Sequence, residues 1–203
     1  MANYDNSAGF YDGLSRLFFG KALVNAQVYL LHFIAANSRV LIVGGGTGWI
    51  LEEITKLHPA SLHITYVEIS ANMTALARQR NTGDNHAEFI NKPIEEVNTD
   101  QLFDVIITPF LFDNFTKDTV EGLFVHMHRM VKAGGLWLYT DFQLTGKFWQ
   151  KVLLKSMYLF FGALCNVPTK TLPDTQALFD KYGYKKIVAK MFFGDFIVSK
   201  MYR

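Results

Sequence analysis

The sequence is poor in features that mark several specialised protein classes. It has one cysteine among 203 residues, Cys165, so it forms no internal disulfide and offers no cysteine cluster for a metal. Only 19% of its residues are charged, and the formal net charge of +2 is too small to indicate a nucleic acid as partner. The longest apolar run, 152–167, is interrupted by polar residues and is shorter than the ~20 residues of a membrane span.

The first residues also lack a targeting signal. Residues 1–5 have neither a basic n-region nor an apolar stretch after it, which predicts no signal peptide and a cytoplasmic location. Half of all residues are apolar and 15% are aromatic, with no repeat or low-complexity segment. This length and composition predict one α/β domain over residues 1–203. Cys165 lies in an apolar stretch, so a buried, inert thiol is expected.

Strand-like and helical patterns alternate along the chain. Continuous apolar runs are typical of parallel strands buried on both faces of a sheet; they occur at 39–43, 63–68, 104–108 and 135–141, with a shorter polar-flanked candidate at 88–91. Helical patterns cover 49–57, 71–80 and 117–132. Two further strands, 185–193 and 196–203, are joined by the turn signal Gly194-Asp195. The predicted fold is α/β, a doubly wound, seven-stranded, mostly parallel sheet that ends in an antiparallel hairpin.

A glycine-rich turn joins the first strand to the first helix of this pattern. It reads Gly44-Gly45-Gly46-Thr47-Gly48-Trp49. Glycines permit a positive φ and let a ligand approach the backbone, and the amides at the following helix start attract an anionic group. A nicotinamide fingerprint would need a glycine at position 49, where the chain has a tryptophan. A nicotinamide oxidoreductase is therefore disfavoured.

An acidic residue ends the second strand, twenty residues after Gly48. This residue is Glu68. In a doubly wound sheet that strand end lies beside the glycine turn, at the crevice where ligands bind. A carboxylate there can accept hydrogen bonds from both hydroxyls of a ribose; the alternative is a solvated glutamate. Ser70 is predicted to cap the next helix.

These residues resemble the class I S-adenosylmethionine-dependent methyltransferases. Residues 40–48 match the first motif of that family, Glu68 matches its ribose-binding acid, and 132–136 match the turn before its fifth strand. The closing hairpin matches the family's sixth and seventh strands. The resemblance implies that the cofactor is S-adenosyl-L-methionine and its product S-adenosylhomocysteine, with the methionine end at the glycine turn.

The resemblance also implies which residues contact the cofactor. They follow the first four strands of the sheet: Val43, Gly44, Gly45, Gly46, Thr47, Gly48, Glu68, Ile69, Met73, Asn91, Pro93, Ile94, Thr108, Pro109 and Phe110. Many family members bind adenine through an aspartate after the third strand, and the stretch 90–95 has no acid at that place. Adenine is instead expected to be held by the Ile94 amide, by packing of Ile69 and Pro93, or by the Asn91 side chain.

The segment that follows the fourth strand faces the methyl acceptor in this family. Phe112 is predicted to contact the acceptor, as is Trp149 from a later helix. Methyl transfer needs a base only when the acceptor must lose a proton. Asp113 and Asp141 are the candidate bases, although Asp113 could instead be an acid at a helix N-terminus. Tyr11 could fold over the cofactor or pack in the core.

No metal site is predicted. His126 and His128 lie two residues apart on a predicted helix, so their side chains do not face each other.

Residues 147–166 form an aromatic helical insert after the fifth strand. Lys147, Lys151 and Lys155 recur every four residues, and most of the remaining positions are apolar. Three interpretations stay open: a helix packed on its own core, a lid over an apolar acceptor such as a quinone precursor, isoprenoid or lipid, or a contact with an anionic membrane surface. The aromatic segment 14–33, within a helical N-terminal cap of about 1–35, is a candidate for the other half of such a lid.

The sequence thus predicts an enzyme that transfers a methyl group from S-adenosylmethionine to an O, N or C atom of a small, largely apolar acceptor, without a nucleic-acid partner. Two alternatives remain. One is a cofactor-binding module without transferase activity. The other is a peripheral membrane-associated methyltransferase that acts on a lipid or quinone-type molecule.

Overall fold

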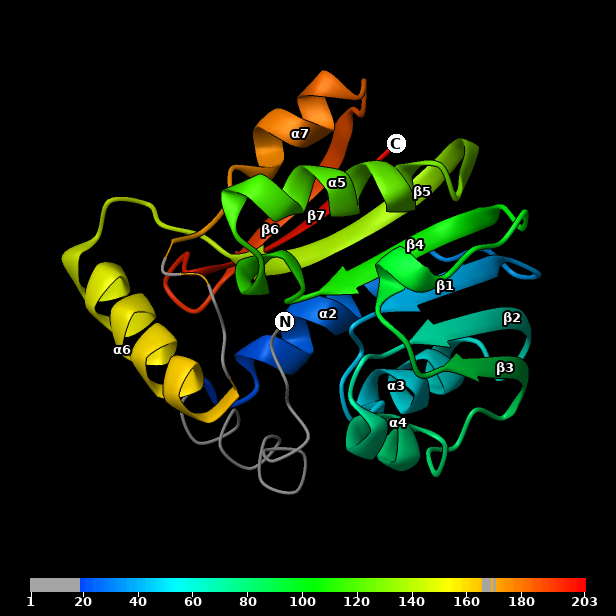
Figure 1. Ribbon diagram of the computed structural model, residues 1–203. Coiled ribbons are helices and arrows are strands. Elements are labelled where there is room, and N and C mark those ends of the chain that lie inside the picture. Colours follow the sequence, from blue (N-terminus) through cyan, green and yellow to red (C-terminus); the bar gives the residue numbers. More distant parts are fainter. Residues whose placement is uncertain (1–18, 166–168, 170) are drawn as a thin grey trace.

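The computed structural model describes residues 19–165, 169 and 171–203, which form a seven-stranded sheet with helices on both faces (Figure 1). The strands are β1 (Arg39–Val43), β2 (Ala60–Val67), β3 (Asp84–Ile90), β4 (Phe103–Pro109), β5 (Val131–Phe142), β6 (Lys186–Phe192) and β7 (Ile197–Tyr202). Their order is β3-β2-β1-β4-β5-β7-β6. β1 to β5 pair in parallel, and β7 runs antiparallel to both β5 and β6. The predicted fold class is confirmed.

Helices on the two faces complete two separate apolar cores. The helices are α2 (Ala22–Leu31), α3 (Trp49–Leu57), α4 (Ala71–Ala77), α5 (Lys117–His128), α6 (Phe148–Cys165) and α7 (Thr175–Lys181). Residues of α2, α3 and α4 pack on one face of the sheet, and residues of α5 and α7 on the other. Ser70 caps α4 as predicted, since its hydroxyl accepts a hydrogen bond from the backbone N–H of Met73 at 3.1 Å.

The central strands supply side chains to both cores. In β1, Leu41 and Val43 belong to the core under α5 and α7, whereas Val40 and Ile42 belong to the core under α2 and α3. Burial on both faces is the reason for the continuous apolar runs in the sequence. Stacked rings fill the first of these cores, with centroids 3.7 Å apart for Phe179 and Tyr202 and 4.8 Å for Phe124 and Trp137.

The structure differs most clearly from the sequence prediction at β3 and where α5 is followed by β5. β3 begins at Asp84 instead of residue 88; as an edge strand it pairs with β2 alone, so its exposed side chains are polar and hide the strand pattern. The helix predicted to reach residue 132 ends at His128, and β5 begins at Val131 opposite Phe103. The pairing then shifts to Val105 opposite Leu136. The turn predicted at residues 132–136 is therefore a bulge within β5.

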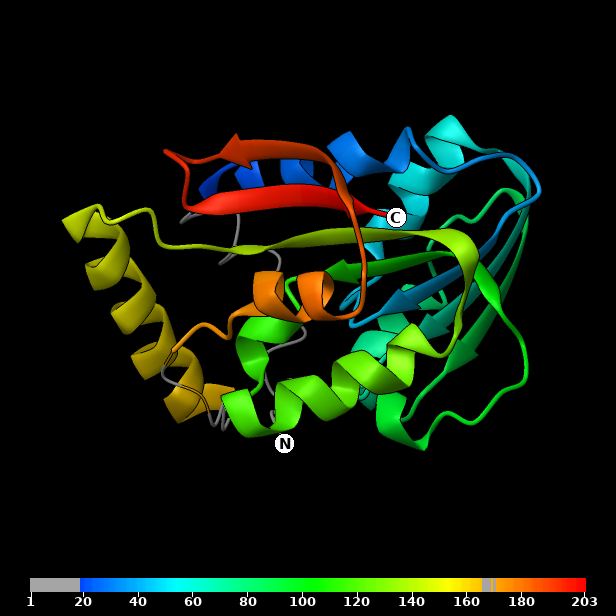
Figure 2. The same cartoon turned by 90° about the horizontal axis from the view of Figure 1, so that it is seen from above.

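The helix of the aromatic insert, α6, lies beyond the end of the sheet, outside both helical layers (Figure 2). Its inner side joins a third apolar cluster, in which Leu154 packs with Phe142 of β5, Phe196 and Ile197 of the hairpin, and Phe19. Across residues 19–165, 169 and 171–203, the helices are all too short or too polar to cross a bilayer.

Candidate functional site

The glycine turn after β1 has a backbone that side chains would disrupt. Gly44, Gly46 and Gly48 have φ of +71°, +64° and +79°, in the left-handed region that favours glycine. A Cβ on Gly48 would lie 2.6 Å from the Cβ of Ala77, where α3 and α4 meet. A Cβ on Gly45 would lie 2.4 Å from the hydroxyl oxygen of Tyr66. The turn is therefore shaped by close packing with β2 and α4.

The carboxylate of Glu68 is in direct contact with this turn. The backbone N–H of Gly46 donates to its Oε2 at 3.0 Å, and the backbone N–H of Ser70 donates to its Oε1 at 3.0 Å. The residue is 5% exposed. A carboxylate offers about four acceptor positions, and these two backbone donors fix its orientation. The turn and the acid, 22 residues apart in the chain, thus form one local structure.

A cavity of about 350 Å³ opens above the turn and the acid. Twelve of the residues predicted to contact the cofactor line it: Val43, Gly44, Gly45, Gly46, Thr47, Glu68, Ile69, Met73, Pro93, Ile94, Pro109 and Phe110. They come from the ends of β1, β2 and β4 with the residues that follow these strands, from the start of η1 (Ile94–Glu96), and from Met73 of α4. We call this space the cofactor cavity because it fits the expected position of the adenosyl group.

Three other predicted cofactor residues, Gly48, Asn91 and Thr108, do not line this cavity. Gly48 is the N-cap of α3. Thr108 is fully buried, and its hydroxyl accepts a hydrogen bond from the indole N–H of Trp137 at 3.0 Å. The Asn91 amide donates to the carbonyl oxygens of Glu68 at 2.8 Å and of Ile69 at 2.9 Å. Asn91 therefore ties β3 to the end of β2, and of the three interpretations for adenine this geometry favours the Ile94 amide and apolar packing.

The cavity also has lining residues that the sequence did not single out, among them Gln27, Leu111, Asn114 and Thr119. Asn114 could have been noticed because it follows Asp113 in the loop after β4. Its amide donates to the carbonyl of Phe110 at 2.9 Å and holds that loop in shape. Gln27 belongs to α2, and no local pattern in this apolar helix connects it to a turn about twenty residues away.

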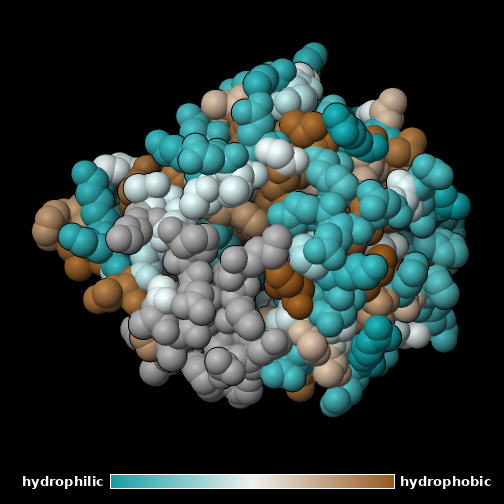
Figure 3. All heavy atoms as spheres, in the orientation of Figure 1, coloured by the Kyte–Doolittle hydropathy of each residue, from teal (hydrophilic) through white to brown (hydrophobic). Residues whose placement is uncertain are grey.

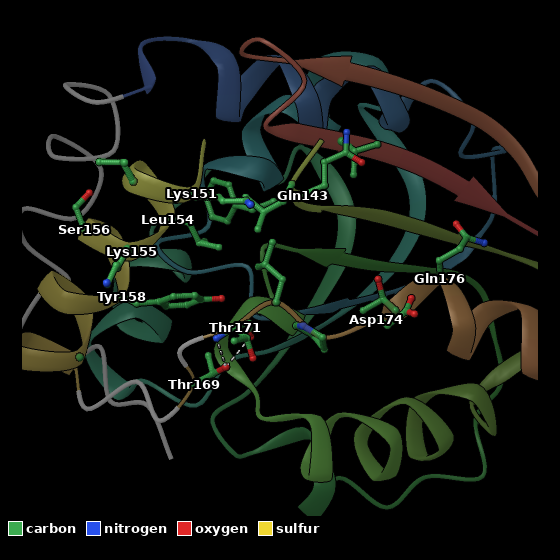
Figure 4. Close-up of a pocket in the computed structure, with 18 of the residues that line it drawn as sticks. Gln143, Lys151, Leu154, Lys155, Ser156, Tyr158, Thr169, Thr171, Asp174 and Gln176 are labelled. Carbon is green, nitrogen blue, oxygen red and sulfur yellow. Dashed lines mark hydrogen bonds between the residues drawn. The ribbon is translucent and has the colours of Figure 1, made fainter. Parts of the chain in front are cut away.

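A second, larger cavity of about 1390 Å³ lies between α6 and the sheet (Figure 4). Its lining comes from the end of β5, from β7, from α6 and from described residues of 169–176. Figure 4 shows Tyr158 extending from α6 into this space. Most of the lining surface is apolar, Lys151, Lys155 and Lys200 supply positive charge, and Asp174 supplies one negative charge. We call it the acceptor cavity.

One layer of side chains separates the two cavities. Phe110 lines the cofactor cavity and Phe142 lines the acceptor cavity, and their ring centroids are 4.9 Å apart. Tyr158, which lines the acceptor cavity, donates from its hydroxyl to the carbonyl oxygen of Asp113 at 3.3 Å.

The two candidate bases, Asp113 and Asp141, are buried and line neither cavity. Asp141 accepts hydrogen bonds from the backbone N–H groups of Phe142 at 2.8 Å and Phe112 at 3.2 Å. Asp113 accepts one from the Asn114 amide at 2.9 Å. Burial, and then the charge of Asp141, raises the pKa of Asp113 well above its usual range. Burial likewise raises the pKa of Asp141, against the lowering effect of its backbone hydrogen bonds.

The two residues predicted to bind the acceptor lie elsewhere. Phe112 is fully buried in the core under α5, with its ring 6.3 Å from that of Trp137. Trp149 packs against Phe193 and Phe196 of the hairpin. Neither residue lines either cavity. Both belong to aromatic clusters, and sequence alone does not separate a core ring from a cavity ring.

The remaining residues singled out in the sequence are Tyr11, Cys165, His126 and His128. Tyr11 and the side chain of Cys165 lie outside the part of the chain that the structure describes. His126 Nε2 lies 3.0 Å from the carbonyl oxygen of Val97, and His128 Nδ1 lies 3.0 Å from the Tyr184 hydroxyl. The two histidines thus have separate local partners.

Substitution of Gly45 by alanine is expected to destabilise the protein and weaken cofactor binding. The new Cβ would overlap the Tyr66 hydroxyl, which donates to the carbonyl of Gly46 at 2.9 Å, so either the ring or the turn must move. Overpacking of this kind typically costs about 1–3 kcal/mol. Urea unfolding and S-adenosylhomocysteine titration would measure both effects. Gly122→Ala in α5, where a Cβ meets nothing within 4 Å, should raise stability by about 0.5–1 kcal/mol. Equal stability of the two variants would contradict the close packing at Gly45.

The buried acid pair is expected to make the protein less stable as pH rises. An acid whose pKa is raised on folding stabilises the folded state fully below its ordinary pKa of about 4 and loses that contribution as pH rises through the raised value. The free energy of unfolding, measured with urea from pH 5 to about pH 8, should fall, and Asp113→Asn should flatten the slope. Asp104→Asn is the control: burial raises the Asp104 pKa, but hydrogen bonds from Lys132 and the Arg39 backbone outweigh this and lower it. Its contribution is therefore lost only as pH falls below about 4, and its removal should leave the slope from about pH 5 to about pH 8 unchanged. A slope unchanged in Asp113→Asn would refute the assignment.

Comparison with known proteins agrees with this geometry. A family model described as a methyltransferase domain matches residues 40–135, from the first strand to the turn in β5. The chain belongs to the class I S-adenosylmethionine-dependent methyltransferases, and it is an S-adenosylmethionine-dependent methyltransferase. Its cofactor is S-adenosyl-L-methionine.

Two curated relatives differ in how much of the chain they match. The ubiquinone/menaquinone biosynthesis C-methyltransferase UbiE of Geotalea daltonii is 33% identical over 190 residues, which cover 90% of this chain and 75% of that protein. The malonyl-[acyl-carrier protein] O-methyltransferase of Bacillus cereus is 33% identical over 109 residues, which cover 53% of this chain and 38% of that protein.

Solved structures share the fold at low sequence identity. The DhpI–SAM–HEP complex has a TM-score of 0.70 at 15% identity and covers 98% of this chain and 94% of its own. Human N-acetylserotonin methyltransferase in complex with SAM has a TM-score of 0.69 at 19% identity and covers 98% and 57%. These similarities establish the fold of the present chain.

Proposed function

We propose that this methyltransferase acts on a small, largely apolar aromatic molecule of the quinone-precursor type, bound in the acceptor cavity. The observation that carries the proposal is the pair of cavities separated by the Phe110–Phe142 contact of 4.9 Å. Methyl transfer requires the acceptor atom to approach the methyl group in line with sulfur, with water excluded. Two spaces divided by one layer of side chains meet this requirement with a small movement.

Cofactor binding uses residues already in place. We expect the ribose hydroxyls to donate to the Glu68 carboxylate, which two backbone N–H groups hold against the glycine turn. Ile69, Pro93 and Ile94 line the cavity on the side where adenine would pack. When bound, S-adenosylmethionine supplies an activated methyl group on sulfur, so the protein needs to align and desolvate the acceptor more than to activate it.

The cavity lining and the share of the chain matched by each relative both support this class of acceptor. Most of the lining surface of the cavity is apolar, and the cavity is large enough for a ring system with an apolar tail. The match to the quinone-biosynthesis relative covers 90% of the chain, whereas the match to the malonyl-carrier relative covers 53%. Because the acceptor cavity is built from residues 139–200, the longer match is the one more relevant to the acceptor.

Transfer of a methyl group to a ring carbon releases a proton from that carbon, and transfer to a hydroxyl releases one from oxygen. The new bond joins the methyl group to the acceptor, the sulfur–methyl bond breaks, and the proton needs a base. We propose that the buried pair of Asp113 and Asp141 receives it. Burial raises the pKa of Asp113 well above its usual range and raises the pKa of Asp141 to about 7, where a carboxylate can act as a base at neutral pH.

The test is product formation with two probes. The enzyme and S-adenosylmethionine are incubated with a demethylated naphthoquinol carrying a short isoprenoid tail, and in parallel with a malonyl thioester. We expect a methylated naphthoquinol and equimolar S-adenosylhomocysteine by mass spectrometry. Methylation of the thioester alone would contradict the quinone-type acceptor and indicate an acyl substrate. Binding of S-adenosylhomocysteine without turnover of either probe would contradict the quinone-type acceptor.

A further inference from the structure

The helix α6 has an outer face that the rest of the described protein leaves exposed. Phe148, Val152, Lys155 and Leu159 are spaced by four, three and four residues and therefore share one side of the helix. Phe148 is 80% exposed and Leu159 78% exposed, and Val152 is 52% exposed. With the neighbouring Lys151, which is also exposed, we call these five residues the α6 outer face.

Exposure of such large apolar side chains is costly without an apolar environment. In Figure 3 hydrophobic surface gathers at the edge of the molecule formed by α6, with hydrophilic residues beside it. The opposite side of the helix is packed on the protein, because Gln150 and Leu154 are buried against the hairpin and β5. The outer face is thus a second apolar surface, in addition to the one that anchors the helix.

The charged residues in the chain segment around this face are all lysines. Residues 142–173 contain the lysines 147, 151, 155 and 170 and no Asp, Glu or Arg, although the whole chain has a net charge of only +2. Lys147 pairs with Asp195 at 2.7 Å. Lys151 and Lys155 lie on the outer face itself, next to Val152. A helix with protruding apolar residues flanked by lysines matches the surface of an anionic bilayer, where apolar groups enter the acyl boundary and lysines meet the headgroups.

The outer face is continuous with the acceptor cavity. Val152 and Leu159 are exposed and also line the cavity, as do Lys151 and Lys155. Figure 4 shows Lys151, Lys155 and Tyr158 arranged along the same stretch of α6 beside this space. An apolar molecule in a bilayer under α6 would enter the cavity without crossing water.

We propose that the α6 outer face binds the surface of an anionic lipid bilayer and that the acceptor cavity takes its apolar acceptor from that bilayer. The second half of this statement rests on the proposed function; the first does not.

Sedimentation with vesicles tests the binding face. Vesicles of phosphatidylcholine with about one third phosphatidylglycerol should bind the protein, and pure phosphatidylcholine should bind it at least about tenfold more weakly. Raising the salt from about 0.1 M to about 1 M should release it from the anionic vesicles. Lys151→Gln/Lys155→Gln should weaken binding at least about tenfold, and Phe148→Ser at least about fivefold.

Matched variants control for general charge and general hydrophobicity. Lys185→Gln/Lys186→Gln removes two exposed lysines at the start of β6. Leu102→Ser removes a leucine that is 43% exposed and directly precedes β4. Both should bind vesicles like the parent protein. S-adenosylhomocysteine affinity should be the same in every variant and reports that the fold is intact. Equal loss in control and α6 variants, or no binding to anionic vesicles, would overturn the proposal. So would a dimer that Phe148→Ser dissociates, because a second copy would then cover the face.

Turnover of the acceptor probe in detergent and in vesicles tests whether the acceptor is taken from the bilayer. Phe148 does not line the acceptor cavity, so Phe148→Ser should leave turnover of a detergent-dispersed naphthoquinol probe unchanged. Turnover of the same probe embedded in anionic vesicles should fall at least about fivefold. If Phe148→Ser left turnover of the vesicle-embedded probe unchanged as well, delivery from the bilayer would be overturned. A protein that binds vesicles but turns over neither form would overturn the proposed acceptor and leave the binding face supported.

Discussion

Glu68→Ala is expected to weaken S-adenosylhomocysteine binding at least about tenfold, because hydrogen bonds to a charged group contribute about 1.5–3 kcal/mol. The substitution removes the acceptor for the ribose hydroxyls and also the acceptor for the backbone N–H of Gly46 and of Ser70. The glycine turn then loses the contact that fixes its position relative to β2. Isothermal titration and circular dichroism would measure the affinity and verify the fold.

Two further variants make this result specific. Glu68→Gln is not conservative here, since its NH₂ group would face one of the two backbone N–H donors; it should resemble the alanine variant. Glu88→Ala removes an exposed carboxylate from the neighbouring strand β3 and should leave the affinity unchanged. An unchanged affinity in Glu68→Ala would mean that the ribose lies elsewhere in the cavity.

Asp113→Asn is expected to lower kcat with the naphthoquinol probe about a hundredfold or more, the usual contribution of a positioned base, with little change in S-adenosylhomocysteine affinity. Asp113 is preferred to Asp141 for this test. An asparagine at 113 can still accept from the Asn114 amide, whereas at 141 its NH₂ group would oppose a backbone N–H of Phe112 or Phe142. Asp118→Asn, an acid in the first turn of α5, is the matched control.

The pH dependence of kcat separates a base from a structural role. A base works in its charged form, so kcat should rise with pH through the raised pKa of the buried pair. This is the opposite direction to the stability, which falls over the same range. Asp113→Asn should remove the rise in kcat. A reduced kcat with an unchanged pH profile would show that Asp113 only shapes the loop after β4.

Much of the fold was predictable because local chemistry determined it. The apolar run of β1, the glycine turn after it and the serine cap of α4 each depend on residues adjacent in sequence. The sequence also predicted most of the lining of the cofactor cavity, because the carboxyl ends of neighbouring parallel strands must meet at one edge. The edge strand β3 was underestimated, because its polar exposed residues give no apolar alternation.

The acceptor side depended on tertiary structure. Phe112 and Phe110 are two residues apart and chemically identical, but the first is buried under α5 and the second lines the cofactor cavity. Asp113 and Asp141 are 28 residues apart, and only the packing of the loop after β4 against the end of β5 places them together and raises the pKa of both carboxyls.

The sequence by itself therefore determined the sheet, the glycine turn and the acid beside it, since strand pairing and backbone freedom follow from neighbouring residue types. The tertiary structure alone decided which aromatic rings are core and which face a cavity, that Asn91 ties β3 to β2, and that α6 lies beyond the sheet with one face exposed. The physical reason is that burial, and with it the hydration of a ring or the pKa of an acid, depends on every chain segment packed around a residue.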